Sequence, residues 1–475
     1  GSMEDIYPQG PATVPKHFSR PSGRYRRHAW LTMAGLALFV IAYGALAGWF
    51  VWMGYGAIAA AIGGTRPVIG LVAGGGAWFL AVFMLKSLFF IRRGSASKDV
   101  EISRAEQPKL FAFLDRLADE AGAPRPHHVY VSGQVNAAVF YDLSVLNLLW
   151  PSRKNLVIGL GLVNVLSLGE FKAVCAHEFG HFAQRSMAVG RWVYTAQQIA
   201  GHIVATRGAL DKFLDGLSRF DLRIAWIGIV LRVIVWAIRA LIDSLFRVVL
   251  MAQRALSREM EMQADLVSVS LTGSDALIDA LHKIPAADDA WDRTIQFVNR
   301  ELAAKRITRN AFAIQTRTLT LVGEMLGIPD YGQLPSRREG GKEHRLFKPD
   351  LAQPPRMWAT HPLSHEREEN AKRIYLTAPI DTRSAWALFE HPSALCEQVT
   401  AHLIGQREGA ELVDTAGSLQ RLDGFFSRIY HDRGYRGIYL NRSPVLGVTR
   451  AEDLATPSPG VTVADLDRLY PASLT

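Results

Sequence analysis

His177, Glu178 and His181 form the pattern His-Glu-x-x-His, whose residue types and spacing could hold a metal ion and activate water. On a helix, side chains four residues apart lie one above the other, so two neutral imidazoles can offer two nitrogens to one Zn²⁺. Glu178 then lies beside the open coordination position, where its carboxylate can accept a proton from water. The pattern is short enough to arise by chance, so its surroundings must support it.

A helix is predicted around this pattern. Residues 167–170, Ser-Leu-Gly-Glu, have the spacing of a capping box, and apolar residues at helical spacing follow. Upstream, residues 155–160 form a short apolar run that predicts a strand leading towards the site. The alternative is a buried helix whose histidines are satisfied by hydrogen bonds.

A hydrolytic zinc site uses three protein ligands and one open position, so a third ligand must come from elsewhere in the chain. Glu261 is the best candidate, because it lies one turn before Asp265 in residues 257–265, a predicted helix. Asp265 could accept a hydrogen bond from the outer nitrogen of a ligating histidine and fix its orientation. Glu259 is the rival ligand, and a solvated acidic helix face is the alternative for the whole stretch.

These motifs, followed by Thr360-His361-Pro362, resemble those of the membrane zinc metallopeptidases that include the HtpX-like proteases and the CAAX prenyl endopeptidases, which are gluzincins. The resemblance covers about residues 103–374. It implies a mainly α, α+β fold, in which N-terminal transmembrane helices precede a zincin-like domain with a small β-sheet. It further implies one Zn²⁺ per chain. The ligands would be His177, His181 and Glu261, with Glu178 as the catalytic base.

The resemblance implies further residues around the cleft. Asn136 and Ala137 match an Asn-Ala element on an edge strand, to which a substrate peptide could add as a further strand. His361 would face the open side of the metal, near the oxyanion. An arginine that would bind substrate follows that motif by a few residues; Arg367 has the more usual offset and Arg373 is the alternative. Without the resemblance, Asn136 and the His-Pro pair are typical of turns.

The N-terminal part predicts a membrane anchor. Residues 1–29 form a basic arm, predicted to be disordered, that begins with Gly1-Ser2, typical of a cloning scar. Residues 30–93 predict a transmembrane hairpin, with an uncharged first span at 30–53 and a second at about 68–91. Basic residues cluster before the first span and after the second. The positive-inside rule therefore places both ends, and the metal domain, in the cytoplasm.

The remaining chain is expected to divide into two parts. We expect a metallopeptidase domain over residues 103–376, with inserted hydrophobic helices at 182–251 and a flexible loop at 331–357, and then a helical and aromatic extension over 377–475. Within the insertion, three arginines recur on one helical face and predict a long helix, which either lies in the interface or packs with this face towards protein, water or lipid phosphate; a third span is the alternative. These arginines are Arg232, Arg239 and Arg247.

Composition narrows the function further. Two cysteines, Cys175 and Cys396, fit a reducing compartment, and the net charge of +9 favours anionic lipid over nucleic acid, for which there is no motif. We expect an integral membrane zinc endopeptidase of a bacterial inner membrane, with the lipid bilayer and a peptide or protein as partners. Its substrates would be membrane-associated or unfolded proteins, or one specific peptide or lipidated substrate, at the cytoplasmic face. The alternative, a catalytically silent zinc-stabilised scaffold or sensor, is disfavoured by the intact Glu178.

Overall fold

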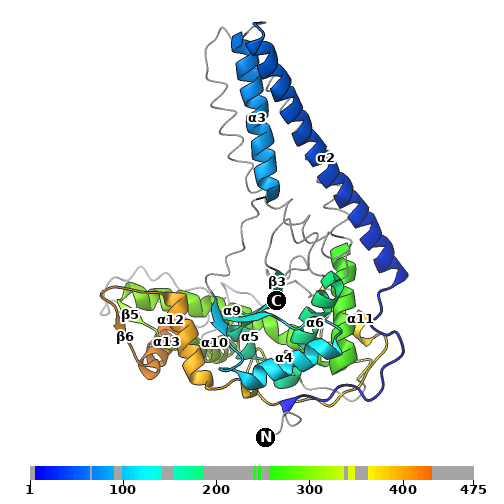
Figure 1. The fold of residues 1–475 in the computed structure, drawn as a ribbon. Coiled ribbons are helices and arrows are strands. Elements are labelled where there is room, and N and C mark those ends of the chain that lie inside the picture. The colour runs from blue at the N-terminus through cyan, green and yellow to red at the C-terminus, as the bar shows by residue number, and fades with distance from the viewer. Residues whose placement is uncertain are drawn as a thin grey trace, which may run out of the picture. The chain divides into compact units, whose positions relative to one another are not determined.

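The computed structural model describes residues 6–64, 67–89, 99–141, 153–186, 256–335, 341–347 and 362–429, with 240, 244, 247 and 254. Helices predominate in this part and one small mixed sheet is present (Figure 1), so the predicted mainly α fold with a small β-sheet is confirmed. Most of the predicted insertion at 182–251, and His361, lie outside the described residues. The chain divides into two compact units, Gly1–Leu422 and Asp423–Thr475.

Two apolar helices, α2 (Gly23–Ile62) and α3 (Pro67–Phe89), pack against each other. Their contact buries aromatic and small side chains, as expected of a helical hairpin. These residues are Tyr43, Ala47, Phe50, Ala81 and Met84. Among the described residues, α2 is the one helix that is long and apolar enough to cross a membrane, judged by length and composition. It contains the whole predicted first span.

The segment before α2 packs on the main domain, where the sequence predicted a disordered arm. Tyr7 is 6% exposed, donates a hydrogen bond to Glu120 (2.6 Å) and lies 3.9 Å under the guanidinium of Arg116. The Lys172 ammonium lies 4.3 Å from the same ring and donates to the Pro8 carbonyl (2.7 Å). These cation–π contacts and hydrogen bonds hold the segment against the domain. Local composition does not reveal such long-range partners.

The sheet has the strand order β1 (Val100–Ile102), β2 (His128–Ser132), β4 (Lys154–Gly159), β3 (Ala137–Tyr141). β2 and β4 are parallel, whereas β3 is antiparallel to β4, with Ala138 opposite Val157. β4 corresponds to the strand predicted upstream of the site. In the described part of the chain β3 forms an edge of the sheet.

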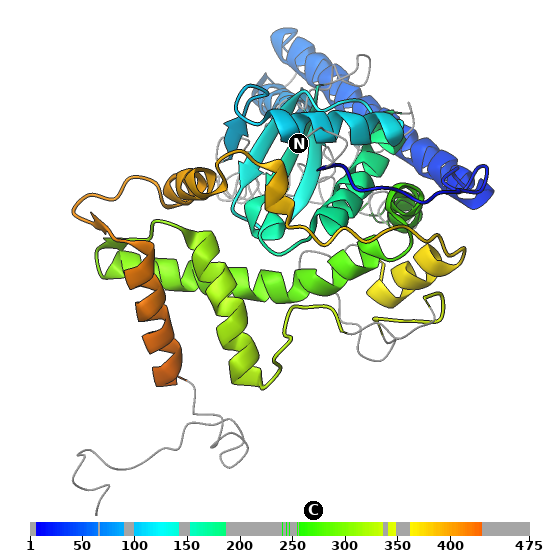
Figure 2. The ribbon, with the colours of Figure 1, turned by 90° about the horizontal axis from the view of Figure 1, so that it is seen from below.

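Two helices, α4 (Pro108–Glu120) and α6 (Leu168–Ser186), cover one face of this sheet (Figure 2). They share one core with alternate side chains of β2 and β4. The strand residues in that core are Val129, Val131, Leu156 and Ile158. At the start of α6, Ser167 Oγ accepts from the Glu170 amide (3.3 Å), as in a capping box. The Glu170 carboxylate instead accepts from Lys283 (2.7 Å).

The remaining elements surround this core. They are α5 (Leu160–Val163), a helical stretch at 256–272, α9 (Ala276–Ala303), β5 (Arg306–Ile307), α10 (Ala311–Leu326), α11 (Ser364–Lys372), the 3₁₀ turn η6 (Ala385–Leu388), α12 (Pro392–Ile404), β6 (Glu411–Leu412) and α13 (Thr415–Ile429). Leu388 and Val399 lie in the same core as α6, and the Leu168 amide donates to the Arg383 carbonyl. The domain therefore continues beyond the boundary predicted at residue 376, because η6 and α12 supply part of its apolar core.

Candidate metal centre

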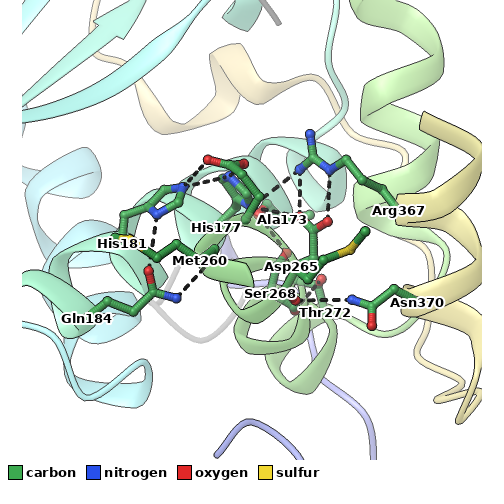
Figure 3. A network of polar contacts seen from close by, with 12 residues as sticks. Ala173, His177, His181, Gln184, Met260, Asp265, Ser268, Thr272, Arg367 and Asn370 are labelled. Atoms are coloured by element: carbon green, nitrogen blue, oxygen red, sulfur yellow. Dashed lines mark hydrogen bonds and ion pairs between the residues drawn. The ribbon is translucent and has the colours of Figure 1, made fainter. Parts of the chain in front are cut away.

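His177, His181 and Glu261 converge in the interior of the domain. Both histidines lie on α6, and Glu261 lies in the helical stretch 256–272. The Glu261 carboxylate oxygens are 3.1 Å from His181 Nε2 and 3.3 Å from His177 Nε2. The Nε2 atoms of the two histidines, which face each other in Figure 3, are 3.1 Å apart. All three side chains are buried, and within the described residues they form the one such group that could hold a metal ion.

This donor set fits zinc. Two imidazole nitrogens and one carboxylate oxygen leave the fourth position of a tetrahedral ion open. With bonds of about 2.0–2.1 Å, neighbouring ligand atoms of such an ion lie about 3.3 Å apart. The two Nε2 atoms are 3.1 Å apart, and each lies 3.1–3.3 Å from one of the two Glu261 oxygens. The rival ligand Glu259 instead lies 3.4 Å from Arg24 and is more exposed. Geometry thus favours Glu261 as the third ligand.

Two small residues set how closely α6 and the helical stretch 256–272 approach. A Cβ atom on Gly180 would lie 3.1 Å from Ala264 Cα and 3.3 Å from its Cβ, which is tighter than ordinary packing. Ser268 Oγ, one turn further on, donates to the Ala173 carbonyl (2.7 Å) and ties the same two helices. Because Ala264 is one turn from Glu261, this contact controls how near the carboxylate comes to the histidines.

The outer nitrogen of His177 faces a buried carboxylate. Its Nδ1 lies 2.8 Å from Asp265 Oδ1, and because a carboxylate only accepts, Nδ1 carries the proton and Nε2 keeps its lone pair for a metal. Burial by itself would lower the pKa of His177, but hydrogen bonds with Asp265 and Glu261 raise it to about 10. The site therefore favours positive charge, either a proton or a metal ion.

Arg367 is buried beside His177 and contacts Asp265. Its Nε and Nη2 donate to both oxygens of Asp265 (2.8 and 2.6 Å), and its side chain is 2% exposed. Burial by itself would raise the pKa of Asp265, but Arg367 and His177 hold it below its usual value. The sequence predicted a substrate contact at Arg367; the structure instead places it as the counter-ion of Asp265. Arg373, the alternative, follows α11 and is exposed.

Of the other predicted residues, the structure describes Glu178, Ala137 and Asn136. Glu178 is 8% exposed on α6, between the two histidines in sequence. Ala137 begins β3, which packs on α6, and Asn136 precedes it, donating to Gln134 Oε1 (3.0 Å). The Asn136 carbonyl accepts from Gly159 of β4 (2.7 Å). His361 lies outside the described residues.

Gln184 contacts the site and was not predicted. It is buried, with Oε1 3.4 Å from His181 Nδ1, and its Nε2 donates to the Met260 carbonyl (3.0 Å; Figure 3). The one signal in the sequence is its position three residues after His181, on the same helical face.

A helix that carries both histidines and the intervening glutamate, met by a second helix with the third ligand and a buried aspartate, is the arrangement of a His-Glu-x-x-His metallopeptidase. The chain belongs to peptidase family M48, whose model matches residues 104–374. This confirms the resemblance noted from the motifs. The family implies a metal ion, and the three converging residues could bind it.

Curated relatives agree with this assignment. The chain is 28% identical over 191 residues to "Protease HtpX homolog" of Trichormus variabilis, covering 39% of this chain and 60% of the relative. It is 31% identical over 218 residues to "Protease HtpX homolog 1" of Streptomyces coelicolor, covering 46% of this chain and 64% of the relative. The chain thus spans somewhat under two thirds of the length of these relatives. No solved structure matches it.

Proposed function

We propose that this chain is a membrane-anchored, zinc-dependent endopeptidase. The observation that carries the proposal is the convergence of His177, His181 and Glu261 at separations that suit one tetrahedral zinc ion, with Glu178 on the same turn of α6. The buried pair of Asp265 and Arg367 orients the first histidine and balances the charge behind it.

Zinc bound by these ligands would lower the pKa of water and polarise the scissile carbonyl. Glu178 accepts a proton from the attacking water as the new C–O bond forms. The same carboxylic acid then returns the proton to the leaving amine nitrogen as the C–N bond breaks. In this proposal His361 donates a hydrogen bond to the oxyanion, a contribution of about 2–4 kcal/mol for one such donor.

The edge strand β3 supports a binding mode for substrate. Because the Asn136 carbonyl points towards β4, the N–H of Ala137 in the same peptide unit points to the open edge. An extended peptide could pair with this edge and run beside α6, with any side-chain sequence. We propose unfolded or membrane-associated proteins, or one specific peptide, as substrates.

The contacts of the N-terminal segment support a topology. Tyr7 and Pro8 pack on the domain that holds the metal centre, and Gln263, two residues from Glu261, donates to the Ser19 carbonyl. The start of α2 and the catalytic domain therefore belong on one side of the membrane. If α2 crosses the membrane, α3 must cross it in the opposite direction to bring the chain back to the catalytic domain. The two helices would then span the membrane as a pair. At about 1.5 Å per residue the 40 residues of α2 extend about 60 Å, enough to cross and project beyond the bilayer.

The surface of the hairpin supports insertion into lipid. Large apolar side chains on both helices are exposed, and water would solvate them poorly. They include Trp30, Leu38, Ile41, Trp52, Ile62, Val68, Leu71 and Val82. Arg24, Arg26 and Arg27 at the start of α2 favour the cytoplasmic side, and we propose the inner membrane of a bacterium.

The Glu178→Gln variant tests the activity. Purified in detergent beside the wild type, it should retain one zinc per chain, because Glu178 is not a ligand, and lose cleavage of an unfolded model protein, because the amide cannot accept a proton. Full cleavage by this variant would exclude Glu178 as the base. Zinc in the wild type without cleavage of any peptide would instead indicate a silent, metal-stabilised scaffold.

A further inference from the structure

We propose that Gln184 is the positioning residue for His181, so that the two histidine ligands are held by chemically different partners, a carboxylate for His177 and a neutral amide for His181. This inference rests on the proposed zinc site and deepens it. It concerns a residue outside the His-Glu-x-x-His pattern, identified by its contacts in Figure 3.

The orientation of the Gln184 amide follows from its surroundings. The Met260 carbonyl can only accept, so the atom 3.0 Å from it must be the amide nitrogen. The amide oxygen then faces His181 Nδ1 at 3.4 Å, and because this oxygen also only accepts, Nδ1 must carry the proton. His181 Nε2 is left with its lone pair, and it points to the Glu261 carboxylate at 3.1 Å. The amide therefore selects the tautomer that can bind a metal.

The same amide joins two elements of the site. His181 and Gln184 lie on α6, whereas Met260 directly precedes the third ligand, Glu261. The contacts form a closed ring, from His181 through Gln184 and Met260 to Glu261 and back to His181. Gln184 is 6% exposed, so no bulk water replaces these contacts when the side chain is lost. The ring restrains both the imidazole and the backbone beside the third ligand.

A neutral partner suits the charge of the site. Three carboxylates, Glu178, Glu261 and Asp265, are buried here, and Arg367 is the cation that pairs with one of them. A further carboxylate behind His181 would add a buried anion, which is costly unless it is paired. The amide fixes the imidazole without that cost. His177, backed by a carboxylate, should accordingly be the stronger electron donor to the metal and His181 the weaker.

Two variants of the full chain in detergent test this role, with zinc affinity measured by competition against a chelator. Gln184→Met has nearly the same length and lacks both polar atoms, so zinc should bind about 10–100-fold more weakly. Gln184→Glu keeps an acceptor for His181 Nδ1 but cannot donate to the Met260 carbonyl, so zinc affinity should fall, though less than in Gln184→Met. With Co²⁺ in place of zinc, Gln184→Glu should shift the visible absorption bands, because a carboxylate strengthens the donor character of His181.

Gln315→Met is the matched control, because Gln315 is also a buried glutamine and donates to two carbonyls, of Gly161 (3.0 Å) and Ala287 (3.3 Å). It should lower thermal stability and leave zinc affinity and the Co²⁺ spectrum unchanged. The inference is overturned if Gln184→Met binds zinc within about threefold of wild type, or if Gln315→Met loses zinc equally. Should Gln184→Met fail to fold, an unshifted Co²⁺ spectrum of Gln184→Glu overturns it. A wild type that binds no zinc would refute the proposed function itself.

Discussion

Asp265 accepts a hydrogen bond from the outer nitrogen of His177, and the same carboxylate accepts two hydrogen bonds from Nε and Nη2 of Arg367. The metal-facing histidine is thus the end of a buried chain of three charged or polar groups, contributed by α6, the helical stretch 256–272 and α11. Each member depends on the next for its orientation, so the effect of losing one can be predicted.

Arg367→Met should leave the Asp265 carboxylate buried without its cation, and the free energy of unfolding should fall by about 3–5 kcal/mol. Denaturant unfolding in detergent at saturating zinc measures this. Arg383→Met is the control, because Arg383 pairs with Asp381 at the surface, where loss of such a pair costs less than about 1 kcal/mol. A variant of Arg367 with unchanged stability and a raised KM would instead support the substrate contact predicted from sequence.

Gly180→Ala should weaken zinc binding. The new Cβ would meet Ala264 at 3.1 Å, so the two helices that carry the ligands must separate by a few tenths of an ångström. Zinc affinity and melting temperature should both fall. Gly424→Ala, in α13, is the control, because a Cβ there meets nothing within 4 Å and alanine favours a helix over glycine by about 1 kcal/mol. Equal stabilisation by both substitutions would show that the helix contact tolerates a methyl group.

Ala137→Pro should impair substrate binding while the fold is retained. Proline removes the N–H that points to the open edge, and the first residue of an edge strand tolerates it. We expect kcat/KM to fall about 3- to 10-fold, the worth of one hydrogen bond of about 0.5–1.5 kcal/mol. Ala138→Pro should instead lower stability, because its N–H points towards β4. If Ala137→Pro cleaves peptides as wild type does, substrate does not pair there.

The free energy of unfolding should depend on pH through the titration of Lys172. Burial lowers the pKa of this lysine to about 8, although Glu120 opposes the shift, whereas in the unfolded chain it lies near 10.4. Below pH 8 both states are protonated and the buried charge costs stability. Between about pH 8 and 10.4 the unfolded state binds more protons, so stability rises with pH, by about 1–3 kcal/mol in total.

Melting curves of wild type and Lys172→Met at pH 7 to 10 check this dependence, since the variant lacks the titrating group. The melting temperature of wild type should rise relative to that of Lys172→Met across this range. A constant difference would mean that Lys172 stays charged, held by Tyr7 and the carbonyls of Pro8 and Leu271.

Sequence alone was enough for features that depend on local geometry. His177, Glu178 and His181 share a helical turn because the period of a helix is fixed by its backbone, and the same period links Glu261 to Asp265. The apolar runs inside α2 and β4 are also local, so both elements could be predicted without knowing the fold.

Tertiary structure decided which distant residues meet. The spacing to Asp265 favours Glu261 over Glu259, but only the approach of two helices at Gly180 and Ala264 brings the Glu261 carboxylate to the histidines. The pairing of Arg367 with Asp265 could likewise not be predicted, because the spacing of a residue from a motif does not give the direction of its side chain. Gln184 and Tyr7 acquire their roles from Met260 and Lys172, far away in the chain. The physical reason is that such pairs form where burial of the whole core brings surfaces together, and no periodicity in the sequence encodes that choice.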